Sequence, residues 1–190
     1  MARISMTTLI AYLRELTSAS TDEFTLNDVT YFTDDHLQTV LDSTSTHQSR
    51  IAIYPVGDYI SGAMVYTRYP LPHYMAYVEG AGDDSVWRVV DGTGATAPAH
   101  TLNMPARHIL FDAPTDGRTY YLTATTYDMH RAASAIWLQK ASSSAKRVNF
   151  SVDGQQVSAG DYHAHCLKMV AYYDGLAGAT TVRRVRMDEV

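Results

Sequence analysis

The chain has 190 residues, a formal net charge of −5 and one cysteine, and it contains no apolar run near the ~20 residues that cross a membrane. A single cysteine excludes an intramolecular disulfide, and 20 acidic against 15 basic residues argue against a protein whose main task is to grip nucleic acid. The length suits one domain with or without a large insertion, and the first residues lack the apolar core of a signal peptide.

Two amphipathic helices are predicted before residue 47. The first spans Ser5–Leu16 and carries its apolar residues on one face. Thr33 can cap the second helix, and Asp34 and Asp35 follow in its first turn, where carboxylates suit the helix dipole. The residues expected to form the buried stripes of these two helices include Leu9, Leu13, Leu37 and Leu41.

From residue 47 to 125 the hydrophobic period changes to two, which predicts a β subdomain of five to seven strands. The expected strands are Ile51–Ile53, Ile60–Tyr69, Tyr74–Glu79 and Val86–Val90, with Pro55–Asp58 as a turn between the first two. Two further segments are expected to pair as one hairpin around Pro114–Gly117. These segments are His108–Phe111 and Thr119–Thr123.

The segment Thr126–Ala177 predicts a helix, a short β-turn unit and a second helix. Apolar residues of the first helix recur at helical spacing, and Val148–Val152 alternates before the turn signal Asp153–Gly154. Ser158 then begins the last helix. The residues expected in the core of these two helices are Ile136, Trp137, Tyr162, Cys166, Met169 and Tyr173.

The C-terminal segment 179–190 alternates apolar and basic residues imperfectly and is too short to fold alone. It reads either as a frayed terminus or as an arm that adds a strand to a neighbouring subunit. The residues that would make contacts in the second case are Val182, Arg183, Arg184, Val185, Arg186 and Met187.

A Trp-bearing helix, the sequence Phe150–Ser158 and a final helix together resemble the head-to-tail connector (adaptor, or head completion) proteins of tailed bacteriophages. The opening helix at Leu9–Arg14 and the segment Tyr31–Asp42, which ends in a Leu-Asp pair, add to the likeness. The resemblance covers about half of the chain in two blocks, and the region between residues 46 and 125 has no counterpart in the minimal family.

The resemblance implies an α+β fold, a four-helix connector bundle with a large antiparallel β insertion between helices two and three and an extended C-terminal arm. The corresponding domains are 1–46 and 126–178 for the bundle, 47–125 for the inserted β subdomain and 179–190 for the arm. The function that the resemblance implies is that of a structural virion protein at the head–tail junction (neck), assembled in the host cytoplasm.

Implied partners are the portal protein, the next neck or tail-completion protein, and further copies of the chain in a twelve-fold homo-oligomeric ring. Genomic DNA would pass through the channel without sequence-specific binding, and no membrane is involved. The arm would reach the portal, with Arg183, Arg184 and Arg186 as contacts to acidic groups. A channel wall of acidic or neutral side chains is expected, because DNA must slide through it.

The motifs that could carry chemistry have simpler structural interpretations, and we expect no enzyme activity, no catalytic residues, no metal and no cofactor. Gly92–Ala97 matches G-x-G-x-x-A but is followed by Pro98, so a turn is favoured over a nucleotide site. His163, His165 and Cys166 are close in sequence, but the two histidines point about 200° apart on a helix.

The alternative is a β-rich tail or baseplate component that binds a receptor or glycan through tyrosines of the sheet. An exposed concave tyrosine cluster would favour this function. The tyrosines concerned are Tyr54, Tyr59, Tyr66, Tyr69, Tyr74 and Tyr77.

Overall fold

The computed structural model describes residues 2–20, 25–26, 29–80, 86–103, 106–144, 150–152, 155–157 and 159–177. It divides into two compact units, Met1–Met129 and His130–Val190, which we describe separately. Within the described residues, no helix has the length and apolar character to span a membrane.

The first unit opens with a 3₁₀ turn, which was not predicted, followed by the two predicted helices. η1 (Ile4–Met6) leads into α1 (Thr7–Thr17), and α2 spans Asp34–Asp42. The Thr33 hydroxyl accepts a hydrogen bond from the backbone N–H of His36 at 3.3 Å, so the expected cap is confirmed. A two-stranded ribbon, β1 (Thr25–Leu26) with β2 (Val29–Thr30), lies between α1 and α2 in the chain.

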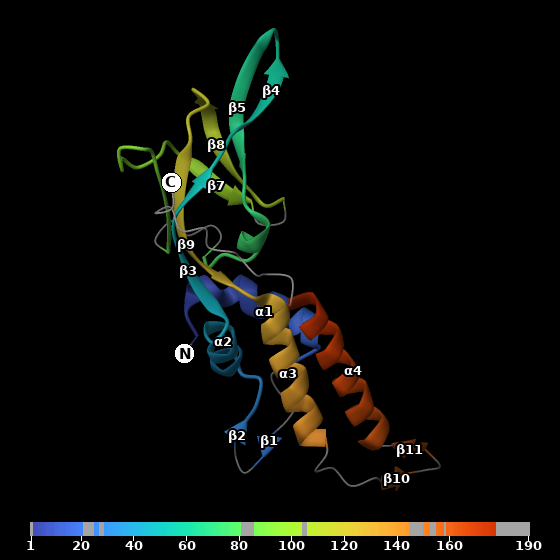
Figure 1. Cartoon of the computed structure of the whole chain (residues 1–190). Coiled ribbons are helices and arrows are strands. Elements are labelled where there is room, and N and C mark those ends of the chain that lie inside the picture. The colour runs from blue at the N-terminus through green and yellow to red at the C-terminus, as the bar shows by residue number, and fades with distance from the viewer. Residues whose placement is uncertain are drawn as a thin grey trace, which may run out of the picture. The chain divides into compact units, whose positions relative to one another are not determined.

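Two antiparallel sheets form most of this unit. The three-stranded sheet has the order β3-β9-β6, and the four-stranded sheet has the order β4-β5-β8-β7 (Figure 1). A second 3₁₀ turn, η2 (His73–Met75), lies between β5 and β6 in the chain. The strand bounds are β3 Ser45–Ile53, β4 Val56–Ile60, β5 Ala63–Pro70, β6 Trp87–Val90, β7 His100–Asn103, β8 His108–Thr115 and β9 Tyr120–Tyr127.

The main hydrophobic core lies among these strands. Side chains from β3, β5, β6, β7, β8 and β9 form one buried cluster. At its centre Tyr69 packs edge-on against Phe111 and Tyr120, with ring centroids 4.9 and 5.4 Å away. The cluster also includes Ile53, Met75, Trp87, Val89, Ile109 and Leu122.

The predictions for the strands were only partly right. The predicted turn at Pro55–Asp58 is wrong, because Val56–Ile60 is β4. The predicted strand Ile60–Tyr69 is confirmed from residue 63 as β5, but it begins too early, since β4 and β5 pair around Ser61 and Gly62. The predicted hairpin of β8 with β9 is absent from the described pairing, since β8 pairs with β5 and β7 while β9 pairs with β3 and β6. The segment Tyr74–Glu79 begins as η2 and makes only an isolated bridge at Val78.

The second unit follows the predicted order of elements. It contains α3 (Met129–Ser144, whose first residue belongs to the first unit), β10 (Phe150–Val152), β11 (Gln155–Val157) and α4 (Ala159–Ala177). β10 and β11 pair antiparallel, with Val152 opposite Gln155, and the predicted turn residues Asp153 and Gly154 lie outside the described residues. The helix–hairpin–helix order expected from the sequence is therefore confirmed.

The expected architecture, a four-helix bundle with a β insertion, is wrong. The chain is α+β with four α-helices among its described residues, but strands of the two antiparallel sheets dominate the core. The physical reason is that the strands between residues 45 and 127 bring their own buried cluster. The β region is thus the main body of the first unit and not an addition to a helical one.

Candidate interaction surface and polar network

The hairpin of β4 and β5 extends beyond the rest of its sheet. β8 pairs with β5 only from Tyr66 to Pro70, so the part from Asp58 to Val65 is a two-stranded ribbon without a further neighbour in the described sheet (Figure 1). Ser61 and Gly62 close the ribbon with φ of 52° and 87°. Positive φ at both central residues is the geometry of a tight two-residue hairpin turn.

Large apolar side chains at the end of this ribbon are exposed to solvent. Tyr59 is 74% exposed, Ile60 55% and Met64 51%. Tyr59 lies opposite Met64, and Ile60 lies opposite Ala63, so the two faces of the ribbon each carry an apolar pair. We call residues Tyr59–Met64 the hairpin tip. Exposed apolar groups concentrated on one projecting element mark an interaction surface.

The base of the hairpin is held firmly to the sheet. The Tyr66 ring lies against the backbone at Gly57 and Gly117, where an added Cβ would be 2.9 and 3.1 Å from ring atoms. The Thr115 hydroxyl donates to the Tyr66 carbonyl at 2.9 Å and forms a 2.7 Å hydrogen bond with the Tyr69 hydroxyl. The base of the hairpin is therefore anchored to the sheet by packing and hydrogen bonds.

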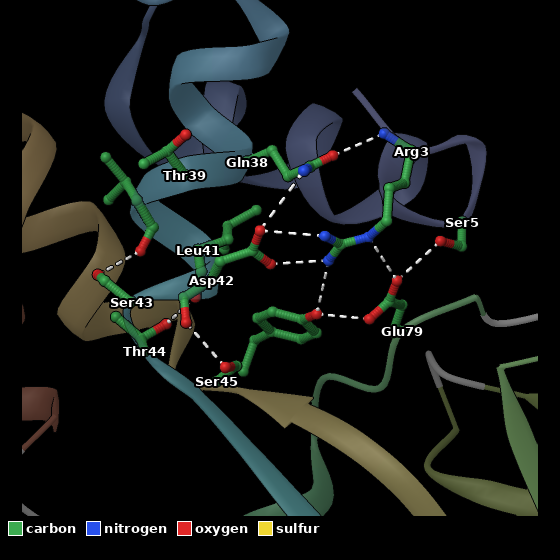
Figure 2. A network of polar contacts seen from close by, with 12 residues as sticks. Arg3, Ser5, Gln38, Thr39, Leu41, Asp42, Ser43, Thr44, Ser45 and Glu79 are labelled. Atoms are coloured by element: carbon green, nitrogen blue, oxygen red, sulfur yellow. Dashed lines mark hydrogen bonds and ion pairs between the residues drawn. The ribbon is translucent and has the colours of Figure 1, made fainter. Parts of the chain in front are cut away.

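A polar network ties the N-terminal segment to α2 and to two parts of the β region. Figure 2 shows the Arg3 guanidinium between the carboxylates of Asp42 and Glu79. The ion-pair distances are 2.7 Å to Asp42 and 3.0 Å to Glu79. Glu79 also accepts hydrogen bonds from Ser5 at 2.8 Å and from the Tyr127 hydroxyl at 2.5 Å.

Electrostatics keep Glu79 ionised in this network. Burial alone would raise the pKa of the Glu79 carboxyl, but hydrogen bonds from Tyr127, Ser5 and Arg3, with the charge of Arg3, set that pKa below 4.5. Burial and the adjacent Glu79 carboxylate raise the pKa of Tyr127 above 10. Both Glu79 oxygens accept hydrogen bonds, so this carboxylate joins the start of the chain to the end of β9.

A groove of about 630 Å³ lies beside this network, between the start of the chain, α1 and the start of α2. Its charged side chains are already paired, since Arg14 contacts Asp34 at 2.7 Å and Arg3 contacts Asp42. The carboxylates of Asp34 and Asp35 occupy the first turn of α2, which disfavours an anionic ligand there. The groove therefore offers no built site for a phosphate.

The loop at Gly92–Ala97 folds around a side chain of the protein itself. The Asp91 carboxylate accepts hydrogen bonds from the backbone N–H of Thr93 at 2.8 Å and of Ala95 at 3.0 Å. The hydrogen bond from the Thr93 hydroxyl, together with these backbone bonds, lowers the pKa of the Asp91 carboxyl. In a nucleotide-binding loop such N–H groups would bind a pyrophosphate, but here they bind the Asp91 carboxylate. The G-x-G-x-x-A sequence therefore forms a turn around Asp91.

In the second unit, the histidines near Cys166 pack against α3. Nδ1 of His163 lies 3.0 Å from the Ala141 carbonyl, and the His165 ring lies edge-on to Trp137 at 5.6 Å between centroids. Cys166 is buried. Over the part of the chain that the structure describes, no group of three or more His, Cys, Asp or Glu side chains is arranged to hold a metal ion.

Most of the residues predicted to lie in the helix cores are buried. Leu9, Leu13, Leu37 and Leu41 are buried in the first unit, and Ile136, Trp137, Cys166 and Tyr173 are buried in the second. Tyr162 and Met169 are half-buried. The six residues proposed for the arm, from Val182 to Met187, lie outside the described residues.

The tyrosines considered for glycan binding do not share one exposed face. Tyr69 is fully buried in the core, Tyr66 lies against the hairpin base, and Tyr77 stacks on Tyr12 with centroids 5.4 Å apart. Tyr54 and Tyr59 are the strongly exposed members, at 65% and 74%. The arrangement gives an apolar tip and not a concave platform.

Sequence reasoning missed the hairpin tip and the Arg3–Glu79 network. The Ser-Gly pair at 61–62, a frequent turn signal, would have located the tip. No sequence signal pairs Arg3 with Glu79, which are 76 residues apart. Comparisons with protein-family models, with curated proteins and with solved structures give no match to this chain.

Proposed function

We propose that this protein is a structural component of the head–tail junction of a tailed bacteriophage. In this role it forms a homo-oligomeric ring, docks on the portal and extends the DNA channel toward the tail. Its support is the second unit, whose order of helix, short hairpin and helix belongs to one of the two sequence blocks that resemble connector proteins.

The surface chemistry is consistent with an assembly protein. The hairpin tip exposes three large apolar side chains, and α4 exposes Leu167, Tyr172 and Leu176 to 44%, 58% and 41%. Exposed apolar groups on two different elements are what a subunit needs to form heterologous contacts, which close into a ring when the rotation allows.

The portal protein encoded by the same genome provides the test. The full-length chain and a version that ends at Gly178 are incubated with purified portal, and binding is measured by co-sedimentation and electron microscopy. A ring on the portal formed by the full chain and lost on truncation supports both docking and the role of residues 179–190. Equal binding of both versions retains the docking and removes the arm from the proposal.

Failure of both versions to bind the portal would reject the docking role. A glycan array probed with the full-length chain then tests the alternative, a receptor-binding tail component. Binding to a defined glycan that is lost on replacing Tyr59 and Tyr54 by serine would establish that alternative.

A further inference from the structure

The three-stranded sheet β3-β9-β6 buries one of its faces and leaves the other partly exposed. Successive residues of a strand point to opposite faces, so alternate residues of β9 line the core. These core residues are Tyr120, Leu122 and Ala124. The residues between them, Tyr121, Thr123 and Thr125, are only partly buried and lie on the outer face.

Two arginines lie on this outer face, one on each side of β9. Arg88 of β6 is directly opposite Thr123, so both side chains project from the same face. The backbone N–H of Arg50 donates to the Thr123 hydroxyl at 3.2 Å, and its guanidinium lies 4.9 Å from the centre of the Tyr121 ring. Because strands are about 4.8 Å apart, the backbones of the two arginines are about 10 Å apart across the sheet. We call Arg50, Arg88, Tyr121 and Thr123 the arginine face.

A β-bulge turns Arg50 to the outside. β3 has one residue more than β9 between the pairs Gln48–Ala124 and Ile51–Leu122. In a regular strand Arg50, two residues after Gln48, would point to the core side as Gln48 does. At the bulge Arg50 instead has φ of 52° and is exposed. Left-handed backbone is uncommon for arginine and bulges re-aim side chains, so the irregularity places this guanidinium on the outer face.

The arginine face is cationic although the whole chain has a net charge of −5. The strands β3, β6 and β9 contain these two arginines and His47 but no aspartate or glutamate. Among the described residues, neither Arg50 nor Arg88 forms an ion pair with a carboxylate. Asp91, which directly follows β6, is bound by its own loop, and Arg88 donates one hydrogen bond, to the Gly94 carbonyl at 3.4 Å. Most N–H donors of the two guanidinium groups are therefore available to an anion.

The chemistry of the arginine face fits a phosphate backbone better than a protein surface. Of the large apolar side chains that are exposed among the described residues, none lies on β3, β6 or β9. A protein–protein interface has an apolar centre, whereas protein–DNA interfaces are more polar and much more positively charged. Arginine guanidinium and threonine hydroxyl groups are common donors to phosphate oxygens.

The aromatic residues of this sheet favour a duplex over a single strand. Proteins that bind single strands stack the bases on exposed aromatic rings. Here the Arg50 guanidinium covers the Tyr121 ring, and the other aromatic side chains of the three strands are buried. Those buried residues are Trp87, Tyr120 and Tyr127. The outer face thus offers charge and hydroxyl groups without an open ring for a base.

We infer that the arginine face binds the phosphate backbone of double-stranded DNA without reading its sequence. Arg50 and Arg88 each contact one phosphate, and the Thr123 hydroxyl lies between them. Two such contacts per chain give weak, salt-dependent binding, which leaves DNA free to slide, although the sequence favoured an acidic or neutral surface where DNA passes. The inference goes beyond the proposed function, because it requires neither a ring nor docking on the portal.

The salt dependence of DNA binding tests the inference on the full-length protein. Fluorescence anisotropy with a labelled duplex of random sequence gives the binding constant between about 50 and 200 mM salt. Arg50→Gln/Arg88→Gln should lower the slope of log K against log salt by about 1.8, or about 0.9 for each arginine, and weaken binding at about 50 mM salt at least ten-fold. Other cationic residues contribute equally to both proteins, so the change in slope reports the arginine face.

Arg107→Gln is the matched control for the loss of one charge. Arg107 is also an exposed arginine with positive φ, of 51°, but it lies outside the three strands, so the slope should stay unchanged. Arg50→Lys/Arg88→Lys keeps both charges and should retain the slope of the wild type. The unfolding midpoint in urea shows that each variant is folded.

Several results would overturn the inference. These are a wild type that does not bind the duplex at low salt, a folded Arg50→Gln/Arg88→Gln variant with an unchanged slope, a slope lowered as much by Arg107→Gln as by Arg50→Gln alone, or tighter binding to single-stranded DNA of the same length. If the double variant lost portal binding and kept its DNA slope, the arginine face would belong to an acidic protein partner instead.

The two proposals fail separately, because DNA binding is measured without the portal. A wild type that binds DNA but does not dock on the portal rejects only the docking role. A wild type that docks on the portal but does not bind DNA rejects only the inference about the arginine face.

Discussion

The Tyr127 hydroxyl donates a 2.5 Å hydrogen bond to one carboxylate oxygen of Glu79, and Ser5 and Arg3 bind the other oxygen. Tyr127 is the last residue of β9, and Glu79 follows the η2 segment. This pair therefore fixes the end of the central strand of one sheet to the start of the chain. Its position makes it the most informative place to test the fold.

Removing the hydroxyl by Tyr127→Phe should destabilise the first unit by about 1–2 kcal/mol, because a buried carboxylate loses a charge-assisted hydrogen bond. Urea unfolding of the full-length protein, followed by tryptophan fluorescence and circular dichroism, measures this change. Tyr59→Phe is the matched control, since Tyr59 is 74% exposed, and it should change stability by less than about 0.5 kcal/mol. Equal effects of both substitutions would contradict the assigned role of Tyr127.

Stability should decrease in acid because of Glu79. Its folded-state pKa is below 4.5, so the network contributes stability above the unfolded pKa and loses it as the pH falls through the folded value. Glu79→Gln should therefore be clearly less stable than the wild type at pH 7, and the difference should shrink below pH 4. Urea midpoints measured from pH 3 to pH 7 test this; a constant difference across that range would refute it.

Gly117→Ala should destabilise the hairpin base. Gly117 has φ of +75°, and an added Cβ would lie 3.1 Å from the Tyr66 ring, so we expect a loss of about 1–2 kcal/mol. Gly92→Ala is the control, because nothing lies within 4 Å of its added Cβ. Thermal or urea unfolding compares the two variants, and a Gly117 variant as stable as the Gly92 variant would argue against this packing.

His163→Ala should weaken the contact between α4 and the end of α3. A carbonyl oxygen can only accept, so Nδ1 of His163 carries the proton that reaches Ala141. Loss of this bond should cost about 1 kcal/mol and speed amide hydrogen exchange in the last turn of α3 several-fold. Lys168→Ala, at an exposed position of α4, should leave that exchange unchanged; faster exchange in both variants would point to a general loosening.

Elements with strong local signals were predictable. The Thr33 cap with Asp34 and Asp35 located α2, and the turn signal Asp153–Gly154 located the β10–β11 hairpin. These signals act within a few residues, so the sequence contains all the information that they need.

The strand pairing was harder to predict from the sequence, because the residues that pair are distant from one another along the chain. β3 begins at Ser45 with six polar residues and has no hydrophobic alternation there, so its first half was not expected to be a strand. β8 and β9 are joined by a short connection and still enter different sheets, since their buried residues complete different parts of one core. Proximity in sequence therefore predicted the wrong pairing partner for both β8 and β9.

The candidate surface could be predicted only in part. A tyrosine-rich region was recognised in the sequence, but burial separates Tyr69 from Tyr59 although both lie in the same hairpin. The Asp91 carboxylate that fills the loop at 92–97 depends on side-chain geometry which a motif does not encode. Exposure and internal hydrogen bonding therefore decided which residues remained available to a partner.

The connection between β9 and α3 has a mechanical consequence. β9 ends at Tyr127 and α3 begins at Met129, so a single residue joins the helix to the central strand of the three-stranded sheet. A pull directed along the axis of β9 acts at right angles to the hydrogen bonds of this strand with β3 and β6. Those bonds resist as a set in shear, which requires a larger force to rupture than peeling them one after another.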